Sequence, residues 1–202
     1  MSRVLPILFN MKMVRAILDG RKSCTRRIIK PQPQGYFEVS EEPLYIYDTD
    51  GKQGKITPPY QPGDILYVRE TWKQAPNGYY YYEDWQKDDI ADVTKWKPSI
   101  HMPKEAARIW LKVTDVRVER LQEITRLSVQ KEGIEVDPKE CAGKFDFITE
   151  LFLLFQKLWD STIKKSDLDS YGWDANPYVW VIEFERCEKP KEEKGNDSGD
   201  SK

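Results

Sequence analysis

Residues 19–30 read DGRKSCTRRIIK and join an expected helix to an expected strand. Gly20 is a natural helix end, because glycine enters the left-handed backbone region without a Cβ clash. The residues that follow favour an extended backbone, since they include Thr25, Ile28 and Ile29. The turn between the two elements gathers lysine, serine, cysteine, threonine and arginine within a few positions. This composition indicates a candidate chemical site, with a solvated basic turn as the alternative interpretation.

Charge is unevenly distributed along the chain, whose net charge is −2. Residues 1–30 contain one anion, Asp19, and these eight cations: Arg3, Lys12, Arg15, Arg21, Lys22, Arg26, Arg27 and Lys30. A protein that coats duplex DNA is usually basic overall, because it neutralises many phosphates. One local cationic site on an acidic body instead suits a nucleotide or a short nucleic-acid segment, unless the asymmetry is accidental.

The composition predicts a soluble protein with one domain. The chain has 202 residues, 33% of them charged, and no apolar run approaches the length that spans a bilayer. The N-terminal apolar segment is too short for a signal peptide and is broken by Pro6. Cys24, Cys141 and Cys187 form no CxxC pair, and His101 is the single histidine. We therefore expect a cytoplasmic protein with reduced thiols, no membrane association, no metal and no cofactor.

Apolar periodicity and turn residues predict many strands and few helices. The expected strands lie at residues 3–9, 24–29, 45–47, 55–57, 65–72, 79–85, 109–119 and 178–185. The expected helices lie at 11–18 after the cap Asn10, at 103–107, at 125–132 after the cap Thr125, and at 145–163. Asp50-Gly51 predicts a hairpin, and a change of apolar phase near Thr114–Asp115 predicts a bulge.

This order of elements predicts an α+β fold, in which short helices surround a small mixed β-barrel. One longer helix is expected in the C-terminal half of the chain. Residues 1–187 would form a single domain. Residues 188–202 are expected to be a disordered tail, because the segment beyond Cys187 has no apolar residue.

The strand expected at 65–72 carries an unusual carboxylate. Its period of two places Leu66, Val68, Glu70 and Trp72 on one face. Burying Glu70 unpaired would be costly, so we expect it to meet a cation or to line a cavity. The alternative to a functional role is a structural one, in which Glu70 forms a salt bridge in the region of Arg26, Arg27 or Arg69. The tyrosines at 79–82 and the tryptophans near them can stack on bases, although packing is the favoured role for most of them.

Three features occur in order along the chain. They are Gly20-Arg21-Lys22-Ser23-Cys24-Thr25-Arg26-Arg27, then Pro62-Gly63-Asp64 before a strand, and finally the strand Val181-Ile182-Glu183-Phe184. Together they resemble the ASCH domain, a family of PUA-like β-barrels, over most of residues 3–187. The chain is similar to long forms found in bacteriophage and prophage genomes. Relative to minimal members, residues 31–60 and 73–107 would be insertions.

The resemblance implies a function in nucleic-acid or nucleoside chemistry. PUA-like domains typically bind RNA or modified bases, and one small ASCH enzyme removes the acetyl group from the exocyclic amine of N-acetylcytidine. The family pattern implicates a lysine, a threonine three residues later and a glutamate in a short helix. Lys22, Thr25 and Glu132 match these positions and are the implied catalytic residues.

The chemistry of such a triad is reasonable, but its geometry leaves alternatives open. Thr25 would attack the amide if a neutral Lys22 removed its proton, and Glu132 would orient the lysine or shuttle protons. Lys22 and Thr25 face opposite sides of a regular strand, so the triad requires Lys22 to lie in the turn. Otherwise the useful face is Ser23, Thr25 and Arg27. Cys24 is a competing nucleophile, with only the distant His101 as a base.

The sequence therefore supports three functional hypotheses. The first is an amidohydrolase that acts on an acylated base or nucleoside. The second is a module that binds RNA or a modified nucleotide without turnover, and the third is a metal-independent ribonuclease. The expected partner is a modified nucleoside or short single-stranded RNA. The candidate substrate-binding residues are Arg21, Ser23, Arg26, Arg27, Glu70 and Trp72.

Overall fold

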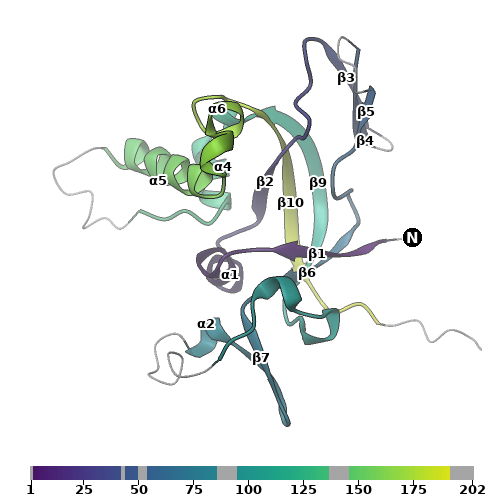
Figure 1. Ribbon diagram of the computed structural model, residues 1–202, viewed down its shortest axis with the longest axis vertical. Helices are drawn as coiled ribbons and strands as arrows, with labels where there is room; N and C mark the ends of the chain where they lie inside the picture. Colours follow the sequence, from purple (N-terminus) through teal and green to yellow (C-terminus); the bar gives the residue numbers. More distant parts are fainter. Residues whose placement is uncertain (1, 42–43, 50–53, 86–94, 137–145, 192–202) are drawn as a thin grey trace, which may run out of the picture.

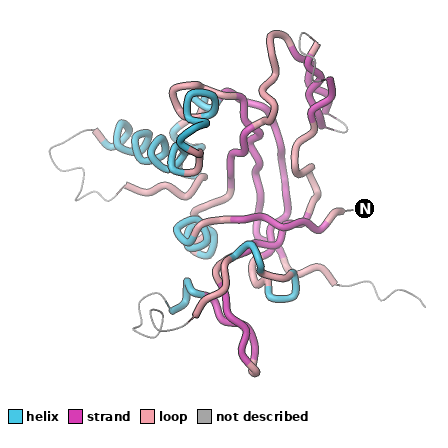
Figure 2. The backbone as a smooth tube through the Cα atoms, in the orientation of Figure 1, coloured by secondary structure: helices cyan, strands magenta, loops and turns pink. Residues whose placement is uncertain are grey.

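The chain folds as an α+β structure around one five-stranded sheet (Figures 1 and 2). The computed structural model describes residues 2–41, 44–49, 54–85, 95–136 and 146–191. The strands are β1 (Val4–Leu8), β2 (Cys24–Ile28), β3 (Phe37–Glu41), β4 (Leu44–Asp48), β5 (Gly54–Ile56), β6 (Ile65–Arg69), β7 (Trp72–Ala75), β8 (Gly78–Tyr81), β9 (Trp110–Arg120) and β10 (Tyr178–Cys187).

Helices connect these strands, and all but α5 are short. The α-helices are α1 (Met11–Leu18), α2 (Tyr82–Trp85), α4 (Arg126–Lys131), α5 (Phe147–Ser161) and α6 (Leu168–Tyr171). The 3-10 helices are η1 (Ser99–His101), η2 (Lys104–Ala106), η3 (Leu121–Glu123) and η4 (Lys165–Asp167). Figure 1 shows α4, α5 and α6 grouped on one side of the main sheet, with α1 close to the end of β1.

The main sheet has the strand order β1-β6-β9-β10-β2. β1 and β6 are parallel, whereas β6–β9, β9–β10 and β10–β2 are antiparallel. Within the described residues this order ends at β1 and β2, which do not pair with each other, so β2 has one free edge. The expected α+β class is confirmed, whereas the described residues form no closed barrel.

The strand β10 lies inside this sheet and is apolar on both faces. Trp180, Ile182 and Phe184 belong to the largest apolar cluster, as their shared period of two predicts. Val179 and Val181 point the other way and belong to a second cluster, which packs against α4 and α5. Two buried faces explain why this strand reads as a continuous apolar run.

A bulge interrupts the long pairing between β9 and β10. Glu183 pairs with Asp115, but the next residue, Phe184, pairs with Val113. Thr114 is therefore the extra residue on β9, where the apolar phase of the sequence changes. This expectation is confirmed.

The two expected insertions build small sheets at the periphery. β3, β4 and β5 form a three-stranded sheet, and β7 and β8 form a hairpin. The pairing of Ile46 with Ile56 confirms the hairpin expected around Asp50-Gly51, although these two turn residues lie outside the described residues. β3 is an element that the sequence did not indicate. The strand expected at 79–85 ends at Tyr81, where α2 begins.

The single apolar face expected for residues 65–72 is wrong beyond Val68. Leu66 and Val68 pack into the largest cluster, whereas Trp72 packs with Tyr67 in a third cluster. β6 ends at Arg69 and β7 begins at Trp72. The alternation is lost because Glu70 lies between the two strands, where the chain changes sheet.

Helix boundaries follow the expected capping residues. The side chain of Asn10 accepts a hydrogen bond from Met13 N, and that of Thr125 accepts one from Ser128 N. The long helix α5 begins at Phe147, after its cap Asp146. Phe145, the first residue of the expected helix, lies outside the described part of the chain. Most of the expected tail, residues 192–202, also lies outside it. In the described part, no helix is long and apolar enough to cross a membrane.

Gly133 allows α4 to end close against α1 and the turn at Lys22. It has a φ of +85°, and a Cβ atom there would lie 2.7 Å from Ala16 Cβ and 3.1 Å from Lys22 Cβ. Gly20 has a similar φ of +75°, but nothing lies within 4 Å of the same position. A substitution at Gly20 therefore adds backbone strain alone, whereas a substitution at Gly133 adds both backbone strain and a steric clash.

We predict that Gly133→Ala destabilises the protein more than Gly20→Ala does. Both variants place a side chain in the left-handed region, at a cost of about 1–2 kcal/mol. Only Gly133→Ala adds a clash with packed atoms, which costs a further ~1–3 kcal/mol. The free energy of unfolding in urea, measured for both variants, tests the difference. Equal losses would mean that α1 yields to the added methyl group.

Candidate active site

The turn after α1 places Lys22 ahead of the strand. The backbone N–H groups of Arg21 and Lys22 both donate to Ala16 O, at 2.8 and 3.0 Å, which ends the helix. Lys22 then forms an isolated antiparallel bridge with Glu132, at the end of α4, and β2 starts only at Cys24. The requirement that Lys22 lie in the turn is therefore met.

Lys22 is a buried ammonium group with three acceptors. Its Nζ donates to Glu132 Oε2 at 2.7 Å, to Glu132 O at 3.0 Å and to Cys24 O at 2.7 Å. The side chain has no exposed surface. Burial lowers the pKa of the Lys22 ammonium, and the adjacent Glu132 carboxylate offsets part of that effect. Lys22 is thus a lysine whose neutral form is more accessible than usual.

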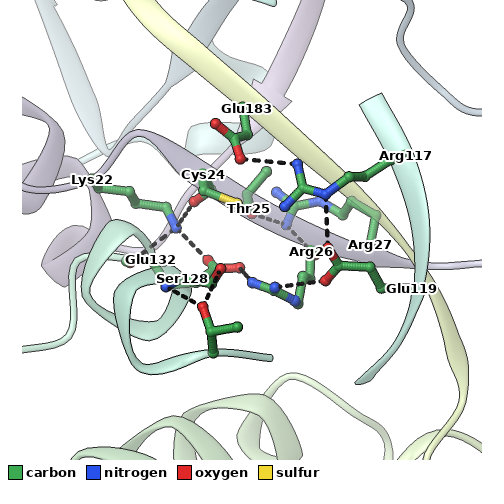
Figure 3. A network of polar contacts seen from close by, with 11 residues as sticks. Lys22, Cys24, Thr25, Arg26, Arg27, Arg117, Glu119, Ser128, Glu132 and Glu183 are labelled. Carbon is green, nitrogen blue, oxygen red and sulfur yellow. Dashed lines mark hydrogen bonds and ion pairs between the residues drawn. The ribbon is translucent and has the colours of Figure 1, made fainter. Parts of the chain in front are cut away.

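Glu132 is held between two cations. Its Oε1 accepts from Arg26 Nη1 at 3.2 Å, while its Oε2 binds Lys22 (Figure 3). The Arg26 side chain is 1% exposed, and its Nη2 donates to Glu119 Oε2 at 3.0 Å. The network continues to Arg117, which donates to Glu119 Oε1 at 2.7 Å. The carboxylate of Glu132 is therefore fixed in position by charge on both sides.

Thr25 does not bond to Lys22; its hydroxyl is bound by Arg27. Arg27 Nη1 donates to Thr25 Oγ1 at 2.6 Å and to Arg26 O at 2.9 Å. Arg27 Nη2 also donates to Leu8 O at 3.3 Å. Burial lowers the pKa of the Arg27 guanidinium, an effect partly offset by the nearby Glu132. Because an arginine remains protonated in proteins, Arg27 brings a lasting positive charge to the Thr25 hydroxyl.

A pocket of about 360 Å³ brings these groups together at β2. Thr25, Arg26, Arg27 and Glu132 all line it, whereas Lys22 does not. Arg21 and Ser23 do not line it either: Arg21 donates to Gly133 O at 3.1 Å, and Ser23 N donates to Lys131 O at 2.9 Å. Arg21 instead lines an adjacent hollow of about 610 Å³, which also contacts Glu132.

The remaining walls of the pocket come from residues that the sequence did not indicate as site residues. The segment from β1 to α1 contributes Leu8, Asn10 and Met13, and the region of α5 contributes Phe155, Leu158, Trp159, Thr162 and Ile163. The sequence signal for these walls is the apolar stripe of α5, which is typical of a core helix. Phe155 and Trp159 are indeed buried, at 3% and 7% exposed, so they serve as both core and pocket wall.

Glu70 and Trp72 lie outside this pocket. Glu70 is buried and paired with Arg108, whose Nε and Nη2 bind its two oxygens at 2.8 Å each. The expected cation is therefore present, but it is Arg108 and not Arg26, Arg27 or a neighbour of Arg69. Burial raises the pKa of the Glu70 carboxyl despite this pair. Glu70 also lines a separate hollow of about 260 Å³.

Trp72 is a core residue. It is 4% exposed and packs with Tyr79, with ring centroids 5.8 Å apart. This placement agrees with the packing role favoured for the aromatic residues.

Cys24 is poorly suited to act as a nucleophile. It is 1% exposed within the second apolar cluster, and burial raises its thiol pKa to about 12. His101 is exposed in η1. Among the described residues, no group of three or more His, Cys, Asp or Glu side chains is placed to hold a metal ion.

Comparisons with protein-family models, with curated proteins and with solved structures give no match for this chain.

We predict that Cys24 resists thiol alkylation in the folded protein. Its thiolate form is scarce at neutral or mildly alkaline pH, and its sulfur is covered. Iodoacetamide labelling near pH 8, followed by peptide mass spectrometry, should modify Cys24 only after unfolding in urea. Native labelling as fast as in urea would contradict this description of the strand.

We predict that Glu132→Gln strongly destabilises the fold. The substitution leaves Lys22 and Arg26 buried without their shared counter-ion, which costs about 3–5 kcal/mol. Urea unfolding measures the loss. Glu185→Gln is the control, because Glu185 is exposed and should change stability by less than about 0.5 kcal/mol. Similar effects of the two variants would show that the buried pair contributes little.

Proposed function

We propose that this protein hydrolyses an N-acyl group from the exocyclic amine of a cytosine nucleoside or nucleotide. One observation carries the proposal: Thr25 and Glu132 line the same pocket, and Glu132 is ion-paired with Lys22. A nucleophile, a proton carrier and a basic amine with a lowered pKa are the groups that amide hydrolysis requires.

We also propose that the fold is a PUA-like barrel of the ASCH type. The five-stranded order with β1 and β2 at its ends supports this, since these two edges are the strands that a barrel would bring together. Arg27 Nη2 reaches Leu8 O from β2, so a side chain spans the gap between them. The motif around Gly20, Lys22 and Thr25 lies at this gap.

The proposed reaction has two stages. Thr25 Oγ1 attacks the acyl carbon, and its proton passes to the Glu132–Lys22 pair. The C–N bond then breaks, and the proton moves to the departing amine, leaving an ester on Thr25. Water attacks this ester, releases the carboxylic acid and restores the hydroxyl. Glu132 is the member of the pair that faces the pocket, so it would relay protons between Lys22 and the substrate.

A second candidate is a module that binds a nucleotide or RNA without turnover. The specific observation in its favour is that Lys22 makes no hydrogen bond to Thr25 in the described structure. Its Nζ is occupied by Glu132 and Cys24, and the hydroxyl of Thr25 accepts from Arg27. A hydroxyl held by a fixed cation is also a good ligand-binding group.

We predict that the purified protein converts N-acetylcytidine to cytidine and that Thr25→Val abolishes this. Valine matches the shape of threonine but lacks the nucleophile, so kcat should fall by roughly a thousandfold or more. Liquid chromatography of the nucleosides measures turnover. Thr25→Ser keeps the hydroxyl and should retain measurable activity.

Folding is the necessary control, because Thr25 is buried. Circular dichroism and thermal unfolding should be similar for the two Thr25 variants. Equal turnover by Thr25→Val and the wild type would exclude Thr25 as the nucleophile. If the wild type binds cytidine but never hydrolyses an acylated form, the binding module is the correct function. Cleavage of labelled RNA would instead favour the ribonuclease.

A further inference from the structure

The charges around the pocket do not balance. Lys22 and Arg26 share the carboxylate of Glu132, and Arg26 also binds Glu119. Arg27 has no carboxylate within ion-pair distance among the residues that the structure describes; its contacts are the neutral oxygens of Thr25, Arg26 and Leu8. Among the described residues, the pocket therefore keeps one positive charge that has no ion-paired carboxylate of its own.

Such a charge is costly to keep unless a ligand uses it. Arg27 is only partly exposed, and its guanidinium loses hydration there. Its three hydrogen bonds leave the Nε–H group and one Nη2–H group without a protein acceptor in the described structure. A guanidinium with free donors at a pocket wall is suited to an anionic oxygen, and the bond would be charge-assisted.

Two further features of the same wall favour an anion. The Arg26 side chain is 1% exposed, lines the pocket, and has an Nε with no hydrogen-bond partner. The first turn of α1 also borders the pocket through Asn10 and Met13, and it contains no acidic residue. The partial positive charge of that helix end therefore adds to the charge of Arg27.

The rest of the pocket limits the size and shape of the ligand. The volume of about 360 Å³ lies near the lower end of the range for small-molecule sites, so it suits a single nucleotide. Its other walls include the apolar side chains of Phe155, Leu158 and Trp159 from α5. A flat base would lie against these walls while a charged group reaches Arg27.

We propose that the ligand is a nucleoside monophosphate and that Arg27 binds its phosphate. The substrate of the proposed hydrolase would then be an N-acylated cytidine monophosphate in place of the free nucleoside. The identity of the base rests on the proposed function, whereas the phosphate site does not.

Isothermal titration calorimetry with cytidine, cytidine monophosphate and inorganic phosphate tests the proposal. The wild type should bind the monophosphate roughly 10-fold to 100-fold more tightly than cytidine, and phosphate should compete with it. Arg27→Gln should reduce the preference to about twofold or less. Arg27→Lys keeps the charge without the planar fork and should retain part of the preference.

Arg126→Gln is the matched control. It also removes one arginine charge, but Arg126 is exposed on α4, and among the described residues its guanidinium forms no ion pair and lies 5.6 Å from the centroid of the Phe147 ring. Its preference for the monophosphate should equal that of the wild type. Equal loss in the Arg126 and Arg27 variants would overturn the proposal, because the general field of the protein would then be responsible.

Other outcomes also test the proposal that Arg27 binds a phosphate. Equal affinity of the wild type for cytidine and its monophosphate overturns the proposal, as does tight binding of single-stranded RNA without a monophosphate preference. A fall in kcat in Arg27→Gln with an unchanged monophosphate preference would assign Arg27 to the transition state and not to the phosphate. If the monophosphate binds through Arg27 but no acylated form is hydrolysed, the proposed function fails and the phosphate site stands.

Discussion

The buried ion pair between Lys22 and Glu132 is the interaction on which the candidate site depends. It joins the turn after α1 to the end of α4, which are 110 residues apart in sequence. The same two residues also form a backbone bridge, and Lys22 lies outside the ladder of β2 with β10, which begins at Cys24. Thr25, on β2, lines the pocket, whereas Lys22 does not line it and is bound to Glu132. Without Glu132, the Lys22 ammonium would be buried with no counter-ion, which is strongly destabilising.

Local sequence signals predicted much of the fold. Asn10 and Thr125 mark the helix starts because their side chains satisfy backbone N–H groups, which is a short-range effect. The bulge at Thr114 follows from a period of two that breaks on one strand. The early position of Lys22 was one of two open alternatives, and the distant contact with Glu132 decides between them.

Contacts between distant segments were not predictable in the same way. The partner of Glu70 is Arg108, and any of several arginines has the same chemistry, so composition alone does not choose among them. The pocket walls from α5 were missed for a related reason. Phe155 and Trp159 have the apolar period of a core helix, and a period does not show whether the far end of a buried ring also touches a hollow. That Arg27 has no ion-paired carboxylate among the described residues likewise follows only from the partners of all neighbouring carboxylates.

The position of β10 inside the main sheet has a consequence for biosynthesis. β2 is completed at Ile28, yet within the described part of the chain it pairs only with β10, which begins at Tyr178. As the chain leaves the ribosome, the segment that carries Thr25 waits for almost the whole protein before its ladder can close. Such distant pairing is slow to form and leaves the backbone of β2 unpaired in the meantime. The ladder that carries Thr25 therefore closes only after β10 has been made, although the sequence of β2 is among the first to be synthesised.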